Sequence, residues 1–229
     1  MKQGITQQLL TGKTRLPGFT EPWRSVCLSD AGATYGGLTG KTKEDFGHGT
    51  ASYVTFMEVM AGPRLRGERL ESVDVGASER QNRVLLGDIL FNGSSETPEE
   101  IALGAAVDFD PASATYLNSF CFGYRVKRPD LINSTYLALY FRANSGRALV
   151  ASLAQGATRY NIAKTKFLKL TPELPAVDEQ RAITAILADS ENEINVLRSR
   201  LTKALAIKQG MMQELLTGRT RLPVAATTS

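Results

Sequence analysis

The chain has 229 residues, with 27 lysines and arginines against 23 aspartates and glutamates, so its formal net charge is +4. Apolar residues make up 42% and charged residues 22% of the sequence, a composition that excludes wholesale disorder. Two cysteines and one histidine are too few for a disulfide-stabilised secreted module or a histidine-rich metal site. The first residues lack the apolar core of a signal peptide, and no segment approaches the roughly 20 apolar residues of a membrane span. We therefore expect a cytoplasmic protein with reduced thiols and without a cofactor or metal.

One sequence block occurs at both ends of the chain. Residues 2–17 read KQGITQQLLTGKTRLP and residues 208–223 read KQGMMQELLTGRTRLP, and twelve of the sixteen aligned positions are identical. The offset of 206 residues is far too long for a solenoid repeat. Residues 1–21 are predicted to hold a short helix that ends at Gly12. Since so short a helix is marginal in water, it must dock on the long helix described below or on a copy of it in another chain.

Residues 22–172 combine strand-like and helix-like runs. Apolar runs predict strands at 52–57, 84–91, 119–126 and 167–170, whereas Pro98–Ile101 predicts a helix start and Ser134–Phe141 a helix. Glycines mark turns between these runs, at positions 36, 37, 40, 47, 49, 62 and 93. The mixture predicts an α/β (α+β) globular domain.

Residues 173–223 form the clearest predicted element, a long helix. Apart from Gly210, residues 178–217 contain neither glycine nor proline, and a heptad seam runs through Ile183, Leu187, Ser190, Ile194, Leu197, Leu201, Ala204, Lys208, Met211 and Leu215. This spacing is typical of a coiled coil. At 1.5 Å per residue, about 40 residues make a rod of roughly 60 Å, longer than a domain of this size can cover. The rod therefore needs a partner helix.

Two polar residues, Ser190 and Lys208, interrupt the seam at core positions. Polar residues at such positions can set the register and number of strands in a coiled coil. The alternative is that both are merely exposed positions on a helix of a globular protein. Residues 224–229 are predicted to be a disordered tail.

Charge is distributed unevenly along the globular part. Residues 125–169 hold nine basic residues and one acidic residue, a net charge of +8, whereas residues 88–110 hold six acids and no base. A basic side of this kind suits a phosphate backbone, although most charge runs are only solvated faces. Arginine, asparagine and tyrosine are residue types that contact bases. Our candidates for DNA contact in this segment are Arg142, Asn144, Arg147, Arg159, Tyr160 and Asn161.

A glycine-rich segment, residues 40–50, adds three further candidates for DNA contact: Lys41, Lys43 and His48. It lacks the GxxxxGK[ST] order of a phosphate-binding loop. His48 has no neighbouring serine or cysteine nucleophile motif, so a DNA-contacting or surface role is favoured over catalysis. Cys27 and Cys121 lie in apolar contexts and are expected to pack. No catalytic residue is predicted.

Five motifs carry a family resemblance: residues 87–101 (GDILFNGSSETPEEI), Tyr136–Phe141, Thr158–Ile162, Leu174–Ile183 and Ile207–Leu222. With them the chain resembles a specificity (S) subunit of a type I restriction–modification system, in a half-length form with a single target-recognition domain. The resemblance covers nearly the whole chain, and its last motif is the most specific.

The resemblance implies a noncatalytic subunit whose recognition domain, residues 22–172, reads half of a split site in double-stranded DNA. In this family two long helices pair antiparallel as a spacer, and the subunit docks methyltransferase (modification) subunits that methylate adenine. Restriction subunits can join them. One recognition domain with one long helix departs from the two of a full subunit.

The missing second half and the unpartnered seam together suggest a homodimer that reads a palindromic split site. The residues expected at the dimer interface are Leu9, Leu10, Ile183, Leu187, Ile194, Leu197, Leu201, Met211 and Leu215. The alternatives are a coiled-coil interaction or scaffold protein and an inactive remnant of a truncated specificity subunit. A self-sufficient methyltransferase is disfavoured, because neither an Asn-Pro-Pro-aromatic tetrad nor a cofactor-binding glycine motif is present.

Overall fold

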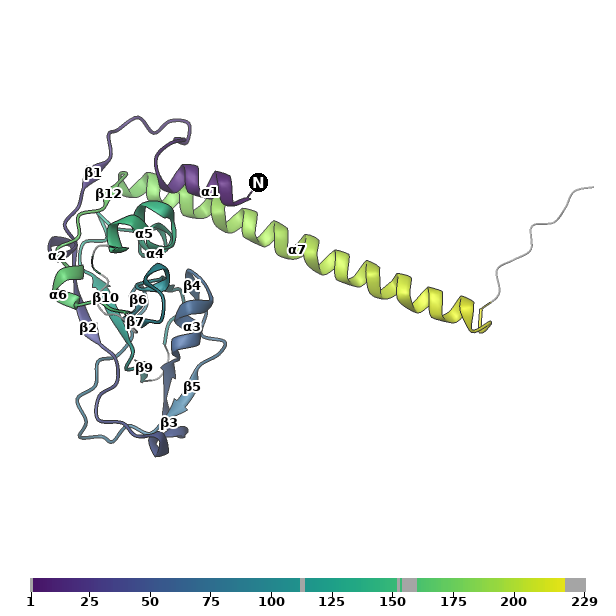
Figure 1. Cartoon of the computed structure of the whole chain (residues 1–229), viewed down its shortest axis with the longest axis horizontal. Coiled ribbons are helices and arrows are strands. Elements are labelled where there is room, and N and C mark those ends of the chain that lie inside the picture. The colour runs from purple at the N-terminus through teal and green to yellow at the C-terminus, as the bar shows by residue number, and fades with distance from the viewer. Residues whose placement is uncertain (1, 112–113, 152, 154–159, 221–229) are drawn as a thin grey trace, which may run out of the picture. The chain divides into compact units, whose positions relative to one another are not determined.

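The computed structural model describes residues 2–111, 114–151, 153 and 160–220 (Figure 1). The chain divides into two compact units, residues 1–184 (unit 1) and residues 185–229 (unit 2). The division falls inside the long helix, after its second turn, rather than ahead of the helix. No helix among the described residues combines the length and the apolarity that a bilayer span requires.

The strands of unit 1 are mostly short. Their bounds are β1 Arg24–Ser25, β2 Gly32–Gly36, β3 Phe46–Val54, β4 Arg64–Leu65, β5 Glu71–Val73, β6 Ile89–Asn92, β7 Ser94–Ser95, β8 Gly104–Val107, β9 Thr115–Leu117, β10 Cys121–Val126, β11 Tyr160–Asn161 and β12 Glu173–Leu174.

The helices are short, with one exception. Their bounds are α1 Lys2–Leu10, α2 Leu28–Ala31, α3 Phe56–Ala61, α4 Ser134–Arg142, α5 Asn144–Ala151, α6 Lys164–Phe167 and α7 Val177–Leu216, with 3₁₀ turns at Lys43–Asp45 (η1) and Pro98–Glu100 (η2). A mixed α/β domain and a long C-terminal helix are therefore confirmed.

The main sheet has the strand order β2-β10-β6-β8-β4, with β4 parallel to β8 and the other pairs antiparallel. A second sheet, β5-β3-β9, pairs β3 with β9 in parallel. Two ribbons, β1-β12 and β7-β11, complete the set. Figure 1 shows β3 and β5 at one end of unit 1 and α4 and α5 at the other.

The core of unit 1 centres on a cluster of aromatic rings. Phe91 of β6 lies 5.3 Å from Phe122 of β10, 5.4 Å from Phe141 of α4 and 4.8 Å from Phe167 of α6, between ring centroids. These four side chains come from a sheet and from two helices that cover it, and all are at most 3% exposed. The cluster therefore joins α4 and α6 to the main sheet.

The approach of α4 to β8 depends on Gly104. A Cβ at this position would lie 2.9 Å from the Phe91 ring and 3.0 Å from the Cα of Ala138. Only a residue without a side chain lets the α4 backbone pack this closely on the strand.

The structure confirms two of the predicted elements and contradicts a third. The helix predicted at 134–141 is confirmed as α4, and the strand predicted at 119–126 is confirmed as β10 with a later start. The strand predicted at 167–170 is wrong, because Phe167 ends helix α6 and the next residues turn. Phe167 and Leu170 are both buried, which a single helical turn achieves as readily as a strand.

The start of α7 is held in unit 1 by a buried glutamine. The amide oxygen of Gln180 accepts a hydrogen bond from the backbone N–H of Asn133 at 2.8 Å. Its amide nitrogen donates to the carbonyl oxygens of Leu131 at 2.8 Å and Pro175 at 2.9 Å. The buried residues of α7 are Glu179, Gln180, Ile183 and Thr184, all in its first two turns. These turns belong to the globular unit.

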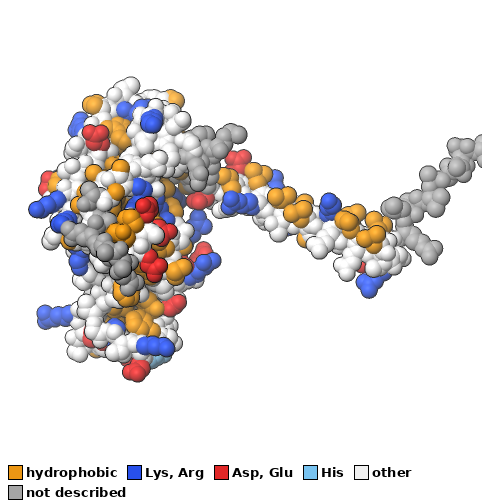
Figure 2. Space-filling model, in the orientation of Figure 1, with side chains coloured by type: hydrophobic (Ala, Val, Ile, Leu, Met, Phe, Trp, Pro, Cys, Tyr) orange, Lys and Arg blue, Asp and Glu red, His pale blue; other side chains and the backbone are white. Residues whose placement is uncertain are grey.

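The rest of α7, in unit 2, exposes its apolar side chains. Figure 2 shows them gathered along this part of the helix. The large exposed ones are Ile186, Val196, Leu197, Leu201, Leu205, Ile207, Met211, Met212, Leu215 and Leu216. A shallow apolar groove is lined by Ala204, Ile207, Lys208, Met211, Met212 and Leu215. We call the large exposed residues of this part of α7, together with the groove residues, the exposed α7 face.

The aromatic cluster generates a stability prediction. Replacing Phe167 with alanine leaves a cavity among Phe91, Phe122 and Phe141 and should lower the free energy of unfolding by about 3–5 kcal/mol. The same substitution at Phe120, whose side chain is 53% exposed, should cost much less. Urea denaturation followed by circular dichroism measures both. Equal losses in the two variants would contradict the assignment of Phe167 to the core.

Candidate nucleic-acid interface

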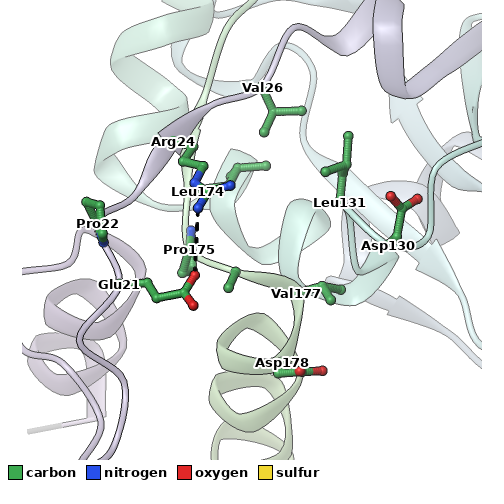
Figure 3. Close-up of a pocket in the computed structure, with 11 residues that line it drawn as sticks. Glu21, Pro22, Arg24, Val26, Asp130, Leu131, Leu174, Pro175, Val177 and Asp178 are labelled. Carbon is green, nitrogen blue, oxygen red and sulfur yellow. Dashed lines mark ion pairs between the residues drawn. The ribbon is translucent and has the colours of Figure 1, made fainter.

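The pocket at the start of α7 holds no catalytic pair of acids. It is lined by Glu21, Pro22, Arg24, Val26, Asp130, Leu131, Leu174, Pro175, Ala176, Val177 and Asp178 (Figure 3). Each of its carboxylates faces a cation: Glu21 pairs with Arg24 at 3.9 Å, Asp130 with Arg128 at 2.7 Å and Asp178 with Arg181 at 3.2 Å. No group of three His, Cys, Asp or Glu residues among the described part of the chain could hold a metal ion.

The candidates Lys41, Lys43 and His48 lie around η1 and the start of β3, and they differ in availability. The Lys41 ammonium lies 2.6 Å from a Glu79 carboxylate oxygen, and its side chain is only 8% exposed. The hydrogen bond that Lys41 donates to Glu79 raises the pKa of Lys41, and the same bond lowers the pKa of Glu79 to about 2. Lys41 thus bridges Glu79 and Asp45 of η1, whose carboxylate oxygen lies 3.9 Å from the ammonium. Lys43 and His48 are exposed.

Arg142, at the end of α4, is committed to the backbone. Its guanidinium donates to the carbonyl oxygens of Val59 at 2.6 Å, Met60 at 3.2 Å and Gly104 at 2.6 Å. Burial, with a smaller contribution from Arg147, lowers the pKa of Arg142 to about 10, so the side chain remains a cation at neutral pH. Its donors join α3, α4 and β8 and are not free to read bases.

In α5, the Arg147 side chain is engaged within unit 1, whereas Asn144 is engaged only through its backbone. The Arg147 guanidinium donates to the carbonyl oxygens of Ile101, Ala102 at 3.3 Å and Phe141 at 3.0 Å. The backbone N–H of Asn144 donates to the side-chain oxygen of Gln7 at 3.0 Å, while its own side chain is exposed. We therefore do not carry Arg142 or Arg147 forward as DNA contacts.

The predicted basic segment loses much of its free charge in the fold. Arg125 pairs with Asp88 at 2.7 Å, and Arg128 pairs with Asp130. Together with Arg142 and Arg147, four of the nine basic side chains are thus engaged within unit 1, and Arg159 lies outside the described residues. Lys127, Lys164, Lys166 and Lys169 are exposed.

Tyr160 and Asn161 form β11, which pairs with Ser94 and Ser95 of β7. Tyr160 is half-buried and Asn161 is exposed. Two residues further on, α6 presents Lys164 and Lys166 to solvent. The strand–turn–helix order thus places a tyrosine, an asparagine and two lysines in one short stretch of surface.

An exposed aromatic residue from the β9–β10 turn joins this stretch. The backbone N–H of Gly93 donates to the carbonyl oxygen of Phe120 at 2.8 Å, and the carbonyl oxygen of Gly93 accepts from the N–H of Ile162 at 3.2 Å. Gly93 therefore lies between Phe120 and the end of β11. We define the β11–α6 patch as Phe120, Tyr160, Asn161, Lys164 and Lys166.

The β11–α6 patch combines the residue types that bind nucleic acid: aromatic rings that stack, an amide that reads base edges and amines that contact phosphates. Sequence reasoning named Tyr160 and Asn161 but missed the other three. Lys164 and Lys166 were counted in the net charge of residues 125–169 but were not named as candidates. Phe120 belonged to a run predicted as a strand. The only signal available for Phe120 was its place next to a turn. The described candidates do not form one surface, because β3 and α5 lie toward opposite ends of unit 1 (Figure 1).

Comparison with known proteins places this architecture in a family. Residues 20–205 match the type I restriction modification DNA specificity domain. The chain belongs to this family. The resemblance predicted from the five sequence motifs is thereby confirmed.

The relatives are about twice as long as this chain. It is 25% identical over 210 residues to a putative type I restriction enzyme MjaX specificity subunit from Methanocaldococcus jannaschii, a match that covers 90% of this chain and 48% of that protein. The fold resembles that of the HsdS subunit from Thermoanaerobacter tengcongensis, with a TM-score of 0.58, 18% identity and coverage of 93% of this chain and 50% of that one.

A chain from a structural study of complex assembly and conformational transition of the type I R-M system matches equally well. Its TM-score is 0.58 at 16% identity, with coverage of 92% of this chain and 50% of that one. The chain thus spans about half the length of the relatives that it matches.

The inward role of Arg142 can be tested by stability. Replacing Arg142 with alanine removes the donors of three carbonyl groups and should lower the free energy of unfolding by about 3 kcal/mol. Lys43→Ala removes the same charge from an exposed position and should change it by less than about 0.5 kcal/mol. Chemical denaturation of both variants provides the measurement. Indistinguishable stabilities would show that the Arg142 hydrogen bonds contribute nothing.

Proposed function

We propose that this chain is the noncatalytic DNA sequence-specificity component of a type I restriction–modification complex. Unit 1 reads one half-site of double-stranded DNA, and the exposed α7 face pairs with the same face of a second copy. The observation that carries the proposal is the match of residues 20–205 to the DNA specificity domain. The partners of the pair are adenine methyltransferase subunits, which restriction subunits can join.

The β11–α6 patch supports the DNA-reading role. Lys164 and Lys166 can contact phosphates and so position the domain, whereas Asn161 can accept from and donate to a base edge. Phe120 and Tyr160 offer ring faces to a sugar or a displaced base. Lys43 of η1 and His48 of β3 are further exposed candidates for DNA contact.

The exposed α7 face supports pairing. Of the predicted seam, Leu197, Leu201, Met211 and Leu215 are exposed, while Leu187 and Ile194 are half-buried. Exposed apolar side chains over several heptads are the pattern that a second helix buries in a coiled coil. Leu9, Leu10 and Ile183 are buried within unit 1, so we leave them out of the pairing face.

A twofold pair would carry two identical recognition domains in inverted orientation. Its DNA site would then be a palindrome interrupted by a nonspecific spacer, and the length of the paired helices would set that spacer.

DNA binding should show the salt dependence of phosphate contacts. Fluorescence anisotropy with duplex DNA should give a linear fall of log affinity against log salt, with a slope of about −0.9 per phosphate contact. Lys164→Ala combined with Lys166→Ala should reduce the size of that slope by about two. Lys13→Ala combined with Lys203→Ala removes two exposed lysines outside the patch and should leave it unchanged. A wild-type slope near zero would instead favour a scaffold protein.

Pairing through α7 should depend on its apolar face. Leu197→Glu combined with Leu201→Glu places two carboxylates in the seam and should convert dimers to monomers in sedimentation equilibrium at micromolar concentration. Ser199→Glu combined with Ala206→Glu puts the same charges on the opposite face of the helix and should leave the dimer intact. A monomeric wild-type protein would refute pairing while leaving the recognition role of unit 1 standing.

A further inference from the structure

The repeated sequence block has the same local structure in both copies. The N–H of Thr11 donates to the carbonyl oxygen of Gln7 at 3.0 Å, and the N–H of Thr217 donates to that of Gln213 at 3.0 Å. Both threonine hydroxyls donate to the same carbonyl oxygens at 2.7 Å. The glycines that follow, Gly12 and Gly218, have φ of 69° and 70°. The helix end is therefore encoded within the block itself.

The N-terminal copy is docked on unit 1. Leu9 and Leu10 are 3% and 1% exposed. The Arg15 guanidinium donates to both carboxylate oxygens of Glu179 at 2.7 Å, and this hydrogen bond raises the pKa of Arg15. Glu179 is 1% exposed, so the ion pair is shielded on the acid's side.

The surface that holds this copy also includes Trp23 and the N-terminus of α5. A Cβ on Gly12 would lie 3.1 Å from the Trp23 ring, and the Asn144 N–H binds the Gln7 side chain. We call Trp23, Asn144 and Glu179 the block-binding surface.

The C-terminal copy leaves the same residues uncovered. Leu215 and Leu216, the counterparts of Leu9 and Leu10, are 37% and 82% exposed. Gln213 and Gly218 are likewise identical to Gln7 and Gly12. The counterpart of Arg15, Arg221, lies outside the described residues.

Two of the four differences between the copies lie at exposed positions. Gln8 and Lys13 of the docked copy, replaced by Glu214 and Arg219 in the other, are exposed. Thr6 is half-buried, and Met212 stands in its place. Methionine is flexible enough to fit at the edge of a contact. The side chain at the remaining difference, Ile5, is not described.

We propose that the block-binding surface also accepts residues 213–220 of a second copy of this chain, in exchange for residues 7–14 of its own. The exchange would place Gln213, Leu215, Leu216 and Gly218 where the identical Gln7, Leu9, Leu10 and Gly12 lie, which makes it a low-cost domain swap. The ion pair of Arg15 with Glu179 lies outside the exchanged residues. In an isolated chain the N-terminal copy has the advantage, because it is tethered close to the surface. The trans form therefore gains population when α7 pairing holds two copies together, and to that extent it rests on the proposed function.

Trp23 is the sole tryptophan of the chain and reports on occupancy of the surface. Leu9→Ala combined with Leu10→Ala should release the N-terminal copy and shift the Trp23 emission to longer wavelength. A synthetic peptide of residues 207–222 should restore the emission in a saturable way. A peptide with Leu215→Ala and Leu216→Ala should bind at least about a hundredfold more weakly. Circular dichroism establishes that the protein variant is folded.

Cross-linking tests the exchange in a protein whose docking residues are intact. Asn144→Cys and Glu214→Cys are combined in a Cys27→Ser background, and ¹⁴N- and ¹⁵N-labelled proteins are mixed with a short bismaleimide. Mass spectrometry should find residue 144 linked to residue 214 in peptides of mixed isotope. Asn144→Cys with Gln8→Cys is the positive control for the cis form, and Asn144→Cys with Ser199→Cys should not link.

The two experiments separate failure of this inference from failure of the proposed function. Neither uses DNA, and the peptide experiment does not need α7 pairing. Peptide binding by a chain that sedimentation finds monomeric would support the docking surface and refute only the pairing. A folded Leu9→Ala, Leu10→Ala protein that does not bind the peptide, or a dimeric protein without 144–214 links, would overturn the exchange.

Discussion

A helix of 40 residues cannot be covered by a globular unit of this size, and most features of this protein follow from that constraint. Unit 1 buries only the first two turns of α7, through Glu179, Gln180, Ile183 and Thr184. Beyond them the apolar side chains are exposed along the helix. Uncovered apolar surface of that extent is unfavourable in water, and burying it against a second helix removes the cost. The helix is thus part of unit 1 at its start, and along the rest of its length it carries the face that we propose for pairing.

The N-terminal copy of the repeated block, residues 2–17, is also a helical segment that needs contacts beyond its own residues. Residues 2–10 form too short a helix to be stable alone, and docking supplies what local propensity cannot. Two buried leucines, a bidentate ion pair to Glu179 and the Trp23 ring hold the segment. The C-terminal copy needs no such support, because it is the end of a long helix. Identical sequence therefore occurs in two environments within one chain.

Electrostatics in unit 1 illustrates how a fold redistributes charge that composition alone counts as free. Arg142 and Arg147 donate hydrogen bonds to backbone carbonyl oxygens of neighbouring elements. Arg125 donates to both carboxylate oxygens of Asp88, and the Oδ2 of Asp88 also accepts from the hydroxyl of Tyr35 at 2.7 Å. These side chains connect neighbouring elements of the core. Lys127, Lys164, Lys166 and Lys169 of the same segment remain exposed.

Sequence alone determined the features that depend on residues close together in the chain. The long heptad-patterned helix, the helix end at Gly12 and the helix over Ser134–Phe141 are all local patterns, and each is present in the fold. Tertiary structure decided which side chains are free. Arg142 and Tyr160 both lie in a basic stretch of sequence, yet one points into the core and the other lies on the surface. Leu10 and Leu216 have the same neighbours in sequence and opposite exposures. Burial and hydrogen bonding depend on segments far apart in the chain, such as Gly104 beside Arg142 or Glu179 beside Arg15, and no local pattern encodes those encounters.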